Sequence, residues 1–189
     1  RNTMKKFFPL FVLILAFSGF LAGQVFFELI DSKAGSFANS KEKFGLYENL
    51  YKELELKTVS DEKINLNNIK APVVILNFWA SWCAPCLKEF PSLVALRNKY
   101  PKDKLSIIGI NSDAENQIRS IATTKRDFKL NFDIIPDQES EITTKFLISE
   151  IPFSIIYYKG KVLEVSTGEM NFTSNDFLAK LDKIITEKN

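Results

Sequence analysis

Residues 72–86 read PVVILNFWASWCAPC, and most of what the sequence predicts about this chain follows from that segment. Residues 72–80 are β-branched, aromatic and almost entirely apolar, which is typical of a central strand covered on both faces. Cys83 and Cys86 come directly after this strand, at the start of a pattern that predicts a helix. A strand followed at once by Cys-x-x-Cys and a helix predicts a redox-active cysteine pair.

The spacing of the two cysteines suits a disulfide that opens and closes reversibly. Across the first turn of a helix, two cysteines three positions apart can form a small ring with little backbone motion. Pro85 is tolerated between them because first-turn amides lack intrahelical partners. The helix dipole and free N–H groups favour a thiolate at Cys83, whereas Cys86 is shielded one turn further in. We therefore expect Cys83 to attack and Cys86 to resolve.

The composition excludes several other kinds of chemistry. The 189 residues include two cysteines and no histidine. This removes histidine-based acid–base catalysis and almost every zinc or copper site, so we expect neither a metal nor a cofactor. The formal net charge is +2, and no basic run follows the N-terminal segment, so we expect no nucleic-acid partner. The two thiols must carry most of the chemistry.

The N-terminal segment predicts a membrane anchor. Residues 7–27 contain no charged side chain. About 20 such residues cross the hydrocarbon core as a helix, whereas the apolar part of a secretory signal has about 7–15. Because Lys5 and Lys6 precede the run, the positive-inside rule places residues 31–189 on the extracytoplasmic, periplasmic face of a bacterial inner membrane. A cleaved signal that releases the protein into the periplasm is the alternative.

Three parts are predicted along the chain. They are a signal-anchor or transmembrane segment at 1–30, a polar linker at 31–50 and a folded domain at 51–189. Apolar periodicity predicts strands at 54–59, 64–66, 105–110, 153–158 and 162–166, and helices at 44–54, 87–100, 113–128, 139–147 and 177–185. Asp113 is the expected N-cap of its helix, and residues 134–137 are expected to be a short extended piece and turn. This order predicts an α/β domain, a mixed sheet with helices on both faces.

Residues 77–91 resemble the active-site segment of the TlpA/ResA group, which are membrane-attached, extracytoplasmic thioredoxin-like proteins, several serving cytochrome c maturation. The similarity extends over residues 54–188 and includes Asn111–Asp113 and the Ile151-Pro152 pair. It implies a thioredoxin-like fold with an N-terminal β-hairpin and an N-terminal transmembrane helix. It also implies a thiol-disulfide oxidoreductase.

The resemblance assigns roles around the cysteine pair. Cys83 matches the nucleophile and Cys86 the resolving thiol of a redox disulfide. Trp82 and Pro85 match motif positions that modulate the pair. Asn77 agrees with the group, whereas thioredoxin itself has an aspartate there, so no carboxylate base is expected at this position.

The resemblance also concerns residues outside the Cys-x-x-Cys motif. Pro152 matches a cis-proline beside the disulfide that leaves the backbone of Ile151 free to pair with an extended substrate. By itself, the sequence favours an ordinary trans proline at a strand start. Glu89 matches a glutamate that tunes the thiols, although a solvated helix carboxylate fits the sequence as well. Phe153 replaces a small hydroxyl residue, and we expect its ring either to narrow the substrate groove or to make it more apolar.

We expect the reaction to be reductive. Strongly oxidising members have a histidine between their cysteines, whereas Ala84-Pro85 supplies no charge. The resemblance implies extracytoplasmic disulfide-containing proteins as substrates, among them apocytochrome c, and a transmembrane thiol-disulfide carrier as electron donor. The alternatives are a disulfide oxidase or isomerase, a copper chaperone, a peroxiredoxin-type peroxidase and a non-enzymatic adaptor. A chaperone ordinarily needs a histidine, and a peroxidase needs a Pro/Thr-rich pocket around its cysteine; this chain has neither.

Overall fold

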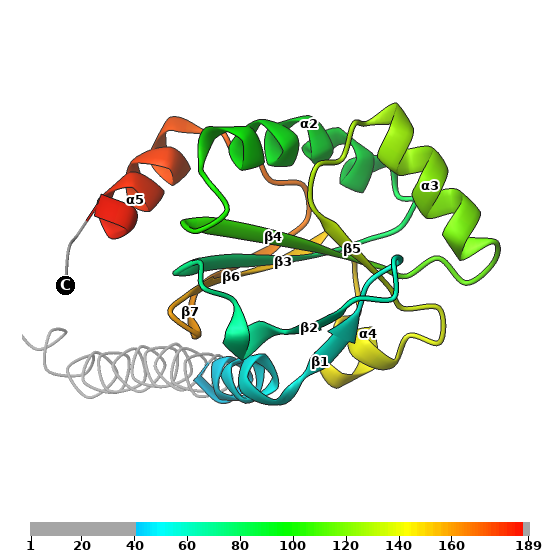
Figure 1. Ribbon diagram of the computed structural model, residues 1–189, viewed down its shortest axis with the longest axis horizontal. Coiled ribbons are helices and arrows are strands. Elements are labelled where there is room, and N and C mark those ends of the chain that lie inside the picture. The colour runs from blue at the N-terminus through cyan, green and yellow to red at the C-terminus, as the bar shows by residue number, and fades with distance from the viewer. Residues whose placement is uncertain (1–40, 187–189) are drawn as a thin grey trace, which may run out of the picture. The chain divides into compact units, whose positions relative to one another are not determined.

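The computed structural model describes residues 41–186 (Figure 1). The predicted anchor at 1–30 and residues 31–40 of the predicted linker lie outside the described residues. The chain divides into two compact units, 1–45 and 46–189, and the following account concerns the second. In the part of the chain that is described, no helix is both long and apolar enough to span a bilayer.

A five-stranded mixed sheet forms the centre of the domain. Its strands, in spatial order, are β5 (Asp133–Pro136), β4 (Leu105–Asn111), β3 (Val73–Trp79), β6 (Phe153–Tyr158) and β7 (Lys161–Thr167). Strand β3 runs parallel to β4 and antiparallel to β6, while β5 is parallel to β4 and β7 antiparallel to β6. Every residue of β3 is buried, as the apolar run predicted.

Helices cover both faces of this sheet, as predicted. One face carries α2 (Ala84–Lys99), α3 (Gln117–Asp127) and α5 (Asn175–Thr186) (Figure 1). The other carries the helical residues 46–53, the hairpin of β1 (Glu55–Lys57) and β2 (Lys63–Asn65), the 3-10 turn η1 (Leu66–Asn68) and α4 (Glu141–Lys145). The predicted N-terminal hairpin therefore exists, but it forms a separate two-stranded sheet.

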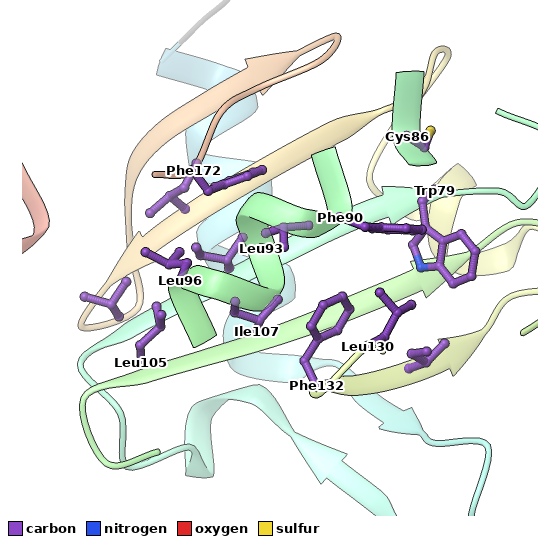
Figure 2. Close-up of a cluster of buried hydrophobic side chains, with 14 of the residues drawn as sticks. Trp79, Cys86, Phe90, Leu93, Leu96, Leu105, Ile107, Leu130, Phe132 and Phe172 are labelled. Atoms are coloured by element: carbon purple, nitrogen blue, oxygen red, sulfur yellow. The ribbon is translucent and has the colours of Figure 1, made fainter. Parts of the chain in front are cut away.

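The alternation of β3 divides the core into two apolar clusters, because successive side chains of a strand point to opposite faces. Val73, Ile75 and Trp79 belong to the cluster beneath α2, whereas Val74, Leu76 and Phe78 belong to the other. Figure 2 shows Phe90, Leu93 and Leu96 of α2 packed in the first cluster together with Trp79. The rings of Trp79 and Phe90 meet edge to face, with centroids 5.1 Å apart. This packing holds α2 across the sheet and fixes the position of its first turn.

The short extended piece expected at 134–137 is strand β5, in which Ile134 and Ile135 are buried and pair in register with Gly109 and Ile110 of β4. Another expectation needs correction. Helix α3 begins at Gln117, so Asp113 is not its N-cap; the residue before the helix is Asn116, which makes no side-chain cap. The carboxylate of Asp113 is bound elsewhere, in the site described below.

The close packing at Gly109 gives the first testable prediction. A methyl group added there would lie 2.8 Å from Nε1 of Trp79 and 3.2 Å from Cε2 of Phe132, so the rings must shift. We expect Gly109→Ala to lower the free energy of unfolding by about 1–3 kcal/mol, the usual cost of overpacking. Denaturant unfolding measures this, with Ser106→Ala on the same strand as control. An unfolding midpoint equal to that of the unmodified protein would contradict the prediction.

Candidate active site

Cys83 and Cys86 are joined in a disulfide at the start of α2. Cys83 is the N-cap residue, with an extended backbone (φ −84°, ψ 96°), and Cys86 lies within the first turn. The Cα atoms are 5.3 Å apart, and the backbone N–H of Cys86 donates to Sγ of Cys83 over 3.3 Å. The sulfur of Cys83 thus occupies the capping position that the spacing predicted, where the helix dipole favours negative charge.

The two cysteines differ in their exposure to solvent. Cys83 retains 4% of its surface, whereas Cys86 is completely buried. Trp82, directly before the pair, is 70% exposed and presents an apolar ring at the surface. No acidic residue stands in the first turn of α2. Of the two cysteines, Cys83 is therefore the one with surface open to solvent.

The loop between β3 and the disulfide is clamped by Asp113. The backbone N–H of Ser81 donates to both carboxylate oxygens of Asp113, over 3.0 and 3.2 Å, and the Ser81 hydroxyl lies 3.1 Å from one of them. Nδ2 of Asn111 donates to the same carboxylate over 2.9 Å. Asp113 is almost fully buried, so each of these bonds satisfies a charge removed from water. This clamp joins the end of β4 to the segment that leads into the cysteines.

Glu89 lies one helical turn after Cys86 and is buried, with 2% of its surface exposed. It is therefore not the solvated helix carboxylate that the sequence also allowed. Its Oε1 accepts a hydrogen bond from Nδ2 of Asn77 over 2.6 Å, and its Oε2 accepts one from the backbone N–H of Met170 over 3.2 Å. Asn77 Nδ2 also donates to Oγ of Ser154 over 3.0 Å.

Burial raises the pKa of Glu89 to about 7. The hydrogen bonds from Asn77 and Met170 act in the opposite direction, because they stabilise the ionised form, and the nearby charge of Glu169 adds to the increase. A carboxyl group with this pKa can bind and release a proton near neutral pH. It stands one turn from the buried sulfur, a geometry suited to moving the proton of Cys86.

The Ile151–Pro152 peptide bond is cis, as the resemblance implies. The carbonyl of Pro152 accepts a hydrogen bond from the N–H of Gly168 over 2.8 Å, whereas the backbone of Ile151 makes none within residues 41–186. Ile151 packs against both apolar clusters, including the cluster that contains the cysteines. Phe153 turns its ring edge-on against Tyr47 and Phe78, so it contributes to the core on the face opposite α2.

The site contains polar residues that sequence reasoning missed. Asp113 was expected to cap the helix that follows it, whereas it binds Ser81. Ser154 was not singled out. Asn77 was named, but its hydrogen bonds were not predicted; a signal for them existed, since it is the one polar side chain in the apolar run 73–79 and a buried amide needs a partner. Within residues 41–186, no group of three or more histidine, cysteine, aspartate or glutamate side chains could hold a metal ion.

Comparison with known proteins identifies relatives of this chain. Residues 48–167 match the model of the AhpC/TSA family. The chain is 34% identical over 149 residues to the thioredoxin-like protein YneN of Bacillus subtilis, across 76% of this chain and 84% of that protein. It is 34% identical over 139 residues to the thiol-disulfide oxidoreductase ResA of Bacillus cereus, across 67% and 79%. The crystal structure of StoA from Bacillus subtilis matches with a TM-score of 0.57 and 27% identity, across 68% and 95%, which confirms the thioredoxin-like fold.

The raised pKa of Glu89 predicts a pH-dependent loss of stability. An ordinary glutamate, as in the unfolded chain, has a pKa of 4.5, so between pH 4.5 and about 7 the unfolded state releases a proton that the folded state keeps. Stability contributed by this group is complete below pH 4.5, falls through that window and stays low above it. We expect a total loss of about 2–3 kcal/mol in the free energy of unfolding. Urea unfolding from pH 4 to 8 should show this fall in the unmodified protein and not in Glu89→Gln; parallel curves would contradict it.

Proposed function

The chain belongs to the AhpC/TSA family and is a thiol-disulfide oxidoreductase of the ResA and StoA type, and we propose that it reduces disulfides in extracytoplasmic proteins through Cys83 and Cys86. The observation that carries this proposal is the disulfide at the first turn of α2, with Cys83 as its more accessible sulfur. A disulfide that closes so small a loop can open without rearrangement of the core around it.

The proposed cycle consists of two thiol–disulfide exchanges. The thiolate of Cys83 attacks one sulfur of a substrate disulfide, forms a mixed disulfide and releases the other substrate sulfur as a thiolate, which takes up a proton. Cys86 then loses its proton and attacks Sγ of Cys83, which reforms the Cys83–Cys86 bond and releases the second substrate thiol. Two electrons have passed from the cysteine pair to the substrate.

Glu89 is proposed to manage the proton of Cys86 in the second exchange. Cys86 is completely buried, so its proton needs an acceptor inside the protein. The carboxylate of Glu89 stands one turn away on the same helical face, and its pKa near 7 allows it to take up that proton and later pass it to solvent. Its negative charge also raises the pKa of both thiols, since a like charge disfavours the thiolate.

The proposal also includes the substrate, the electron donor and the location of the protein. A substrate segment would add to the backbone of Ile151, whose N–H and C=O are unpaired within the described residues. Apocytochrome c, which carries its own pair of cysteines, is the proposed substrate, and cytochrome c maturation the process served. The pair would be returned to the dithiol form by a transmembrane thiol-disulfide carrier. The proposed location is the outer face of a bacterial inner membrane, with residues 1–30 as the anchor.

Trapping the mixed disulfide tests the roles of both cysteines and the substrate class. With Cys86→Ala in cells, the second exchange cannot occur, so we expect a disulfide-linked complex between Cys83 and its partner. Mass spectrometry after non-reducing electrophoresis identifies the partner and the cysteine that holds it. Cys83→Ala is the matched control and should capture nothing. A partner held through Cys86 in the control, or no complex with either variant, would contradict the assignment.

The direction of the reaction predicts a low reduction potential. Equilibration of the full chain with glutathione or dithiothreitol buffers, followed by counting free thiols, measures it. We expect a value in the range of reducing thioredoxins, about −270 mV, rather than that of strong oxidants, about −120 mV. A potential near the oxidising end would replace reductase by oxidase as the function of the same two cysteines.

A further inference from the structure

Three buried polar side chains from three different elements meet one helical turn below the disulfide. They are Asn77 of β3, Glu89 of α2 and Ser154 of β6, none of which exposes more than 2% of its surface. The amide nitrogen of Asn77 lies in the middle, 2.6 Å from Oε1 of Glu89 and 3.0 Å from Oγ of Ser154. We call Asn77, Glu89 and Ser154 the buried polar triad.

The sheet register places two members of the triad directly opposite each other. Asn77 and Ser154 are partners in the antiparallel pairing of β3 with β6, so their side chains share one face of the sheet. Asn77 alternates with Ile75 and Trp79, which belong to the cluster beneath α2. The amide therefore points to the helix that carries Glu89, and it has no alternative partner in solvent.

The polarity of the contact favours one charge state of the carboxyl group. A hydrogen bond from an amide N–H to a carboxylate is roughly twice as strong as one between neutral groups, so it favours ionised Glu89. Both donors of the Asn77 amide are used, one by Glu89 and one by Ser154, while its Oδ1 is buried with no partner within residues 41–186. The orientation of the amide is thus determined by what its nitrogen binds.

We propose that Asn77 and Ser154 are positioning residues that set the proton affinity of Glu89: Asn77 by donating to its carboxylate, and Ser154 by holding the amide in the donating orientation. This inference rests on the proposed function, in which Glu89 exchanges a proton with Cys86. An aspartate at position 77 would bring a second carboxyl group into the same buried site, where the two would share a proton. The asparagine keeps Glu89 able to ionise in spite of its burial.

Two charged residues flank the triad. On α2 the neighbouring charge is Lys88, and on the segment after β7 it is Glu169, and these two form an ion pair of 3.9 Å at the surface. The thiols of Cys83 and Cys86 add further titratable groups when the disulfide is open. A surface pocket of about 380 Å³ is lined by Lys88, Glu169 and Met170, and the N–H of Met170 also donates to Glu89. Proton exchange with solvent is expected on this side.

The test is an infrared pH titration of the oxidised full chain in detergent, where no thiol titrates. The band of the protonated carboxyl group is assigned to Glu89 by its loss in Glu89→Gln. We expect Asn77→Asp to move the midpoint of this band upward by about one pH unit or more, a tenfold or greater gain in proton affinity. Ser154→Ala should move it upward by less, and Ser154→Thr, which keeps the hydroxyl, should restore the original midpoint.

Ser92→Ala is the matched control, since Oγ of Ser92 donates to the backbone carbonyl of Glu89 over 2.7 Å without touching its carboxylate. An unchanged midpoint in folded Asn77→Asp and Ser154→Ala, or an equal shift in Ser92→Ala, would overturn the inference. Circular dichroism establishes that each variant is folded, and the Ser154 variants still decide the question if Asn77→Asp does not fold. Because the titration needs no substrate, its failure is distinct from a failure of cysteine trapping.

Discussion

The complete burial of β3 is the constraint on which the rest of the domain depends. With both faces covered, the strand is held by packing on each side, and the chain leaves the sheet after Trp79. The edge-to-face contact between Trp79 and Phe90 then lays α2 across β3 and β4. The carboxylate of Asp113 holds the loop between β3 and α2 by accepting hydrogen bonds from the backbone N–H of Ser81. The first turn of the helix, and Cys83 with it, has little freedom to lie anywhere else.

Burial in the same core raises the pKa of Glu89, and it also makes the folded state less stable when Glu89 is ionised. A carboxyl group beneath the disulfide loses hydration, and this loss opposes ionisation more than two hydrogen bonds from Asn77 and Met170 favour it. The group is therefore poised near neutral pH, but the folded state holds it less favourably than the unfolded chain does once the pH rises. An apolar residue would pack there without this penalty. In the proposed function, proton transfer rather than stability accounts for a carboxyl group at this buried position.

Much of the fold could be predicted from local patterns in the sequence. The apolar run of 73–79, the hairpin of β6 and β7 and the helical stripes gave the element order, because each depends on residues near one another in the chain. What local patterns could not supply were contacts between distant segments. Ser81 and Asp113 are 32 residues apart, and Asn77 and Ser154 are 77 apart, so their hydrogen bonds become visible only after the sheet is assembled. The pairing of β5 with β4 was not predicted for the same reason, since it joins two separate segments of the chain.

The surroundings of the sulfurs bear on the direction of electron flow. In strongly oxidising proteins of this fold, the reduced dithiol form is stabilised relative to the disulfide. The main cause is stabilisation of the thiolate of the attacking cysteine. Here the helix dipole supports that thiolate, but Ala84 and Pro85 add no charge, and Lys88 is 69% exposed and screened by water. Glu89, a buried acid one helical turn after Cys86, carries a charge that in the proposed function disfavours a thiolate. Destabilising the reduced pair lowers its potential, so the network that holds Glu89 supports the proposed role as a reductant.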